Sequence, residues 1–181
     1  MGLFSPSPSK QTKAFLKGMK AYRNGKYPRC RKLWQTLADS GVARAQAGLA
    51  HLYANGLGMD KDPVQAFHWT LKAAEQGLAQ AQNNLGWYYE HALGIERDLD
   101  AALHWYHQAA EQGDSVAQTN LGAIHARSNG EHEQALHWFR RAAKLGNHQA
   151  QQALADAYEF GRLGLSRDQQ QASYWHQQAQ R

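Results

Sequence analysis

Apolar and small side chains recur along this chain with a period of 36 residues, and the recurrence predicts its fold. The full pattern has Ala, Leu and Tyr at four-residue steps, then Gly and Asp, then Ala, Trp and a pair of alanines. In the second copy these positions are Ala81, Leu85, Tyr89, Gly94, Asp98, Ala102, Trp105, Ala109 and Ala110. Steps of three and four residues gather side chains on one face of a helix. Repetition with a period between about 20 and 50 residues is typical of a solenoid.

Two helices are predicted within each copy. Asp62 and Pro63 mark the start of the second helix in the first copy, because aspartate caps helix N-termini and proline suits the first helical position. Asp98 and Asp168 occupy the same place in later copies. A glycine that can adopt a left-handed conformation follows the second helix. The copies delimited in this way are 41–76, 77–112, 113–145 and 146–181, of which the third is three residues shorter.

The first 40 residues follow the pattern only in part. Residues 1–9 hold two Ser-Pro pairs and no helical spacing, which predicts a disordered tail. Residues 10–40 predict a degenerate fifth hairpin, in which Pro28 opens the second helix. Its first helix is indicated by apolar residues at three-residue steps, namely Leu16, Met19 and Tyr22. Cys30 takes the place of an alanine in the third copy, so we expect a small packed residue rather than a nucleophile.

The repeated string resembles the Sel-1-like repeat family, which is related to tetratricopeptide repeats. It runs Ala-x-x-x-Leu-Gly-x-x-Tyr, a glycine loop, Asp, then Ala-x-x-Trp-x-x-x-Ala-Ala-x-x-Gly, and it covers residues 41–181. Residues 10–40 are closer to a tetratricopeptide hairpin. The chain departs from the family at His125, which replaces a tyrosine, and at Ala50 and Ala155, which replace glycines. The resemblance implies an all-α, right-handed superhelix (an α-solenoid) and a non-enzymatic adaptor or scaffold that binds another protein or peptide.

In related solenoids the first helices line the concave side, so the helix face opposite the packing face is expected to form a groove for the partner. At 100° per residue, that face gives the following predicted groove residues: His51, Asn55, Asn83, Trp87, Glu90, His91, Thr119, Arg127, Asp156 and Phe160. Trp87 is the large indole among them, and tryptophan is enriched at binding hot spots. The alternative, which the sequence leaves equally open, is that Trp87 packs against a neighbouring first helix.

Charge is distributed unevenly along the chain, whose formal net charge is +5. Residues 1–38 carry nine basic and no acidic side chains, whereas the remainder carries eleven basic and fifteen acidic ones. The lysines that share one helical face are Lys10, Lys13, Lys17 and Lys20. Such a patch favours an anionic partner, whether nucleic acid, acidic protein or anionic lipid, although a solvated capping face explains the same pattern. Nucleic acid ranks below a protein partner, because the tyrosines nearby are predicted to be packing residues.

No convergent set of reactive groups is evident, so neither a catalytic residue, a metal site nor a cofactor is predicted. His68, His104 and His137 precede the tryptophan of successive copies and are expected to be exposed and far apart. His104 and His107 lie one turn apart, but two nitrogens without a third ligand make a weak metal site. The recurring tryptophans are expected in the core; they are Trp69, Trp105, Trp138 and Trp175.

The sequence also predicts a cytoplasmic protein. No apolar run approaches the ~18 residues needed to span a bilayer. The N-terminus lacks the apolar segment of a signal peptide. Cys30 is the single cysteine, which agrees with a reducing compartment.

Overall fold

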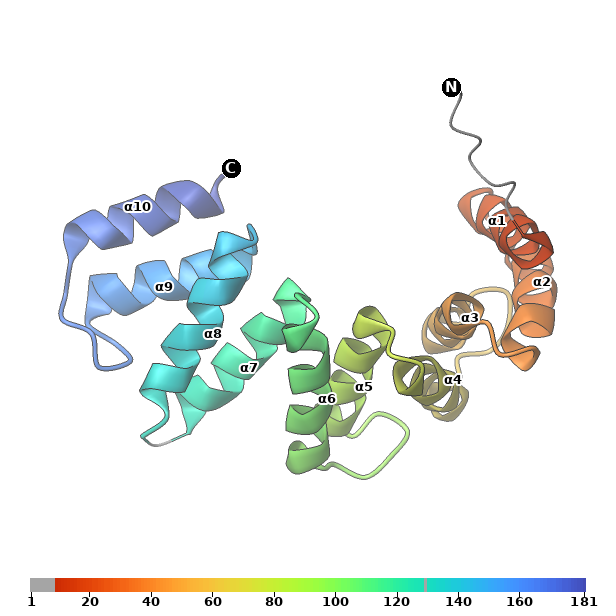
Figure 1. Ribbon diagram of the computed structural model, residues 1–181, viewed down its shortest axis with the longest axis horizontal. Helices are drawn as coiled ribbons and strands as arrows, with labels where there is room; N and C mark the ends of the chain where they lie inside the picture. The colour runs from red at the N-terminus through yellow and green to blue at the C-terminus, as the bar shows by residue number, and fades with distance from the viewer. Residues whose placement is uncertain (1–8, 129) are drawn as a thin grey trace, which may run out of the picture. The chain divides into compact units, whose positions relative to one another are not determined.

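The chain is all-α in the computed structural model, which describes residues 9–128 and 130–181. These residues form ten helices and no strand (Figure 1). In order they are α1 (Lys10–Arg23), α2 (Tyr27–Asp39), α3 (Ala43–Asn55), α4 (Pro63–Glu75), α5 (Ala79–His91), α6 (Leu99–Glu111), α7 (Ser115–Arg127), α8 (His132–Lys144), α9 (His148–Phe160) and α10 (Gln169–Ala179). The predicted solenoid of helical hairpins is confirmed. No helix in the described ranges is both long and apolar enough to cross a bilayer.

Two compact units divide the chain between Asp98 and Leu99. In the first unit, α1 packs on α2 and α3 on α4, while α2 contacts α3 and α4 contacts α5 (Figure 1). In the second unit, α7 packs on α8 and α9 on α10, while α6 contacts α7 and α8 contacts α9. The first core includes Trp34 and Leu49, and the second includes Phe139 and Leu154. Each repeat thus buries its apolar face on its neighbours.

The predicted helix starts and stops are present. Asp62 Oδ1 accepts a hydrogen bond from the backbone N–H of Gln65 at 2.9 Å, and Asp168 caps α10 in the same way. The helix α6 begins directly after Asp98. The glycines that follow the second helices have left-handed φ angles, and they are Gly77, Gly113 and Gly146. The predicted tail falls on residues 1–9, of which the structure describes only Ser9. The Ser9 hydroxyl caps α1 by accepting a hydrogen bond from the backbone N–H of Thr12.

A buried glutamine ties the start of each repeat to the end of the one before it. Its Nε2 donates to a backbone carbonyl eight residues earlier, in the last turn of the preceding second helix. The four bonds are Gln46 to Ala38 (3.2 Å), Gln82 to Ala74 (3.2 Å), Gln118 to Ala110 (3.0 Å) and Gln151 to Ala143 (3.1 Å). Each of these carbonyls also accepts the backbone N–H of the glycine three residues later, so the glutamine uses the second lone pair of the oxygen and joins two consecutive repeats.

The apolar face predicted for α1 is wrong at Leu16, which is 54% exposed. The buried residues of α1 are Gly18 and Ala21. A Cβ atom on Gly18 would lie 2.3 Å from the indole nitrogen of Trp34, so the missing side chain is what allows α1 to approach α2. Leu16 lies about 200° from Gly18 around the helix and therefore faces away from Trp34.

The predictions for the recurring aromatic and histidine positions are mostly confirmed. Trp69 and Trp138 are buried, and Cys30 is 0% exposed. Trp105 and Trp175 are only half-buried, which corrects the expectation that all four tryptophans lie in the core. The expectation that His68, His104 and His137 are exposed is confirmed.

Candidate functional site

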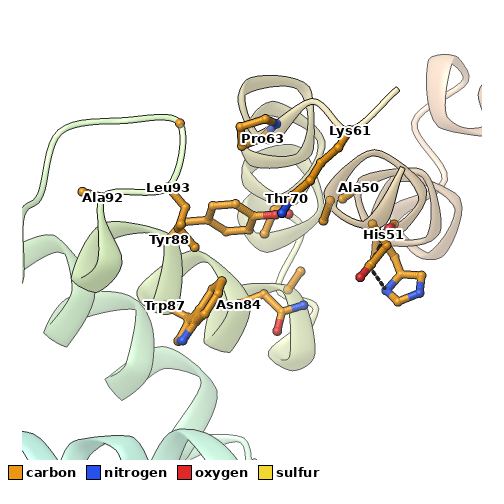
Figure 2. Close-up of a pocket in the computed structure, with 15 residues that line it drawn as sticks. Ala50, His51, Lys61, Pro63, Thr70, Asn84, Trp87, Tyr88, Ala92 and Leu93 are labelled. Atoms are coloured by element: carbon orange, nitrogen blue, oxygen red, sulfur yellow. Dashed lines mark hydrogen bonds between the residues drawn. The ribbon is translucent and has the colours of Figure 1, made fainter. Parts of the chain in front are cut away.

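A pocket of about 630 Å³ opens in the first unit, where α3, α4 and α5 meet (Figure 2). Alanines of α3 and α5 supply small apolar surface, and Trp87, Tyr88 and Leu93 supply large apolar side chains. Lys61, in the loop before α4, is the one charged residue among those that line it. The volume falls in the range of about 300–1,000 Å³ that is usual for ligand pockets.

His51 forms part of the wall (Figure 2), and both nitrogens of its ring have hydrogen-bond partners. Asn55 Nδ2 lies 3.2 Å from His51 Nδ1 and donates to the His51 carbonyl at 2.9 Å. Since the amide nitrogen can only donate, Nδ1 is the acceptor and Nε2 carries the proton. His51 Nε2 then donates to the hydroxyl oxygen of Tyr22 at 2.9 Å. The N-terminal hairpin therefore fixes this wall through Tyr22.

Trp87 forms the opposite part of the wall and is 46% exposed. Its ring lies 4.9 Å from the ring of His91, centroid to centroid, and His91 Nδ1 donates to the Trp87 carbonyl at 3.0 Å. The ring of Tyr88 meets that of Trp87 edge-on. Two residues of its own helix thus contact the indole, while nearly half of its surface stays accessible.

Tyr88 crosses the pocket toward Thr70 on α4 (Figure 2). Burial raises the pKa of the Tyr88 hydroxyl, and a hydrogen bond with Thr70 opposes that shift. The hydroxyl therefore stays protonated near neutral pH and serves as a hydrogen-bonding group. None of the residues that line the pocket is a carboxylate, a serine or a cysteine.

The loop after α5 forms one edge of the pocket through Ala92, Leu93 and Gly94. Gly94 has φ +75°, and a Cβ atom there would lie 2.8 Å from the carbonyl carbon and oxygen of Pro63. Glycine is therefore required both for the backbone conformation and for the close approach to the start of α4. Sequence reasoning missed the loop residues that line the pocket, because helical periodicity says nothing of a loop's path.

In the first unit, the structure brings together three of the predicted groove residues. His51, Asn55 and Trp87 line the pocket, and His91 contacts Trp87 from outside it. Asn83 was predicted wrongly as a groove residue, because its side chain is only 9% exposed. Its neighbour Asn84 lines the pocket instead, about 100° further around α5.

Glu90, a further predicted residue of this unit, is half-buried on α5. Its carbonyl accepts a hydrogen bond from Arg97 Nε at 3.2 Å. It does not line the pocket.

The other predicted groove residues belong to the second unit. Thr119 is 7% exposed, so its assignment to an open groove was wrong. Its hydroxyl donates to the carbonyl of Ser115, one turn earlier on α7, at 2.8 Å, and Asn147, the N-cap residue of α9, donates to the same carbonyl at 3.3 Å. Arg127 and Phe160 are exposed, and Asp156 is half-buried.

Comparison with known proteins matches the Sel1 repeat four times, at residues 43–78, 79–114, 115–147 and 148–179. Among solved structures, a Sel1 repeat protein from Oxalobacter formigenes is 31% identical, with a TM-score of 0.85 over 94% of this chain and 72% of that one. A protective antigen of uropathogenic Escherichia coli with an SLR fold is 39% identical, with a TM-score of 0.78 over 83% of this chain. The match covers 33% of that antigen's own length. No curated protein matches the chain.

Proposed function

The chain belongs to the Sel1 repeat family, whose repeats are generally protein–protein interaction modules, and we propose that it is an adaptor that binds a segment of a partner protein in the first-unit pocket. The observation that carries the proposal is the half-exposed indole of Trp87 beside the alanine-lined space. Large aromatic side chains in such settings dominate binding energies at protein interfaces.

The pocket favours a partner segment that joins an apolar anchor to an acidic group. An apolar side chain would fill the space between the alanines and Trp87, where it would remove apolar surface from water. Lys61 is the charged lining residue and would pair with a carboxylate beside that anchor. The preference for an acidic group rests on Lys61, because residues 39–98, which supply the pocket lining, carry four basic and seven acidic side chains.

A library of random dodecamer peptides displayed on phage tests this function. Wild-type protein should enrich peptides in which an aromatic or leucine residue lies near Asp or Glu. For an enriched peptide, Trp87→Ala should weaken binding by roughly 2 kcal/mol, or about thirtyfold. Lys61→Glu should remove the preference for acidic residues. Fluorescence anisotropy of the labelled peptide measures each dissociation constant.

Phe160→Ala is the matched control, because Phe160 is 48% exposed but lies outside the pocket. It should leave peptide affinity unchanged. Trp87→Ala should lower the free energy of unfolding by less than the ~3–5 kcal/mol that is lost when a buried aromatic side chain is truncated to alanine. Equal enrichment by wild type and Trp87→Ala, or a collapse of the melting temperature in that variant, would refute the proposal.

The basic face of α1 is a second candidate surface, for nucleic acid or another anionic partner. Its lysines are all exposed, while the buried side of α1 carries Gly18 and Ala21; the lysines are Lys10, Lys13, Lys17 and Lys20. A labelled oligonucleotide bound there should dissociate steeply with added salt and fail to bind when Lys13, Lys17 and Lys20 are changed to Glu. Peptide binding in the pocket should depend less on salt, which separates the two functions.

A further inference from the structure

Three side chains with metal-ligating atoms meet in the second unit, between α9 and α10. They are Asp156 and Glu159 on α9 and His176 on α10, and their ligand atoms all lie within 4.8 Å of one another. His176 Nε2 lies 3.0 Å from Glu159 Oε2. All three residues are half-buried, and in the described residues no other group of three such side chains comes together.

The hairpin geometry explains why these residues meet. Asp156 and Glu159 are three residues apart and share one face of α9. The helix α10 packs directly on α9 (Figure 1), and His176 directly follows the repeated tryptophan position, at Trp175. In the earlier copies that place is taken by residues that are buried, namely Thr70, Tyr106 and Phe139. The last copy replaces a packing residue with an imidazole that faces a carboxylate.

A second contact orients the site. Gln152 Nε2 donates to Asp156 Oδ1 at 2.8 Å, one turn earlier on α9. Hydrogen bonds of this kind fix a carboxylate in place for a metal and are typical of the groups behind metal ligands. The Asp156 carboxylate is therefore held on the helix face that it shares with Glu159.

We propose that Asp156, Glu159 and His176 form a binding site for a Zn²⁺ ion. Zinc bonds to imidazole nitrogen and carboxylate oxygen are about 2.0–2.2 Å long, which places the ligand atoms of a tetrahedral site about 3.3–3.6 Å apart. The contact between His176 and Glu159, at 3.0 Å, is slightly shorter than this spacing, and small side-chain rotations would bring both atoms and the Asp156 carboxylate to it. One imidazole with two carboxylates suits zinc, whereas calcium and magnesium prefer sites made of oxygen alone.

Three protein ligands leave a coordination position for water or for a side chain of a bound protein. Zinc would bond to the Nε2 lone pair, so any proton that His176 Nε2 shares with Glu159 leaves when the ion binds. In its place the ion links α9 to α10, the last hairpin of the chain. Zinc should therefore stabilise this hairpin against unfolding.

The second unit supplies its own control, because it has another histidine–glutamate contact. His125 Nδ1 lies 2.8 Å from Glu131 Oε2, but this pair is not part of a group of three ligands. If one histidine and one carboxylate are enough to hold zinc, the ion should bind at both His125 and His176. If the third ligand is required, the ion should bind only at His176.

Competition between the full-length protein and a chromophoric zinc chelator tests the proposal. Wild type and His125→Gln should each bind one Zn²⁺ with the same affinity. His176→Gln and Asp156→Asn should bind it at least about tenfold more weakly, while far-UV circular dichroism stays unchanged. Thermal melts give a second measurement, in which zinc raises the melting temperature of wild type and His125→Gln but not of His176→Gln.

Two results would overturn the proposal. The first is wild-type protein that does not withdraw zinc from the chelator. The second is a His176→Gln variant that binds zinc as tightly as wild type, since the ion would then be held by other members of the ten histidines.

Discussion

Gln118 lacks a hydrogen bond that the equivalent glutamine of the first repeat makes, and one substitution should restore it. Gln46 Oε1 accepts from Gln76 Nε2 at 2.6 Å, whereas the buried Gln118 Oε1 has no partner. The position equivalent to Gln76 is Leu145, whose side chain cannot donate. The backbone there is the same, with φ −85° and ψ 7° at Gln76 and φ −85° and ψ 6° at Leu145. Leu145→Gln should therefore place an amide donor against Gln118.

The size of the effect follows from the burial of the two positions. Gln118 is 1% exposed, and an unsatisfied buried polar group costs about 1–3 kcal/mol. Leu145 is 58% exposed, so removing its side chain loses little buried apolar surface. We expect Leu145→Gln to raise the free energy of unfolding by about 1 kcal/mol. For a chain of this size that is a rise of about 2–4 °C in the melting temperature.

Thermal and urea unfolding followed by circular dichroism measure this change. Gln76→Leu is the reciprocal variant, because it removes the donor from Gln46 and should lower stability by a similar amount. An unchanged or lower melting temperature for Leu145→Gln, with the expected loss for Gln76→Leu, would show that Gln118 gains nothing from a donor. The equivalence of the two repeats at this position would then be wrong.

Two further predictions concern the loop glycines and the single thiol. Gly94→Ala should lower the free energy of unfolding by more than Gly164→Ala, because both glycines have left-handed φ angles but only a Cβ at Gly94 meets Pro63. Urea midpoints measure the difference, and equal losses would mean that the loop moves away freely. Cys30 is fully buried, and burial raises the pKa of its thiol to about 11. It should react with a thiol reagent at pH 8 only as urea unfolds the protein, and rapid labelling without urea would contradict its packing role.

The fold was predictable because packing positions in a solenoid must recur. The 36-residue period located the hairpins, and Asp62 with Pro63 located the start of α4. The prediction failed at Leu16, where three-residue spacing indicated an apolar face. Gly18 decides which side of α1 faces Trp34, and a glycine contributes nothing to a pattern of hydrophobic side chains. The absence of a side chain is a packing signal that periodicity does not record.

The candidate site was predictable only where a helix alone determines it. Helical spacing placed Trp87 opposite the packing face, and its side chain is 46% exposed. The same spacing failed for Asn83 and Thr119, both of which are buried. The Thr119 hydroxyl donates to the Ser115 carbonyl, where Asn147 at the start of the next first helix also donates, and a single-helix argument leaves out that second contact. Leu93 lines the pocket because Gly94 lets the loop lie against Pro63, a contact between segments that no local pattern encodes.

Each proposed site includes a residue from the same equivalent position of the repeat, and this explains how a repetitive fold can carry different chemistry. The position is held in turn by His51, Trp87, Ala123 and Asp156. His51 and Trp87 are exposed and Asp156 is half-buried, whereas the small Ala123 packs against the core of the second unit, so the position accepts side chains of different size and polarity. In the first unit it supplies the histidine and the indole of an apolar pocket. In the second it supplies a carboxylate beside Glu159 and His176. Peptide binding and zinc binding should therefore be separable by mutation, with Trp87→Ala affecting only the first and Asp156→Asn only the second.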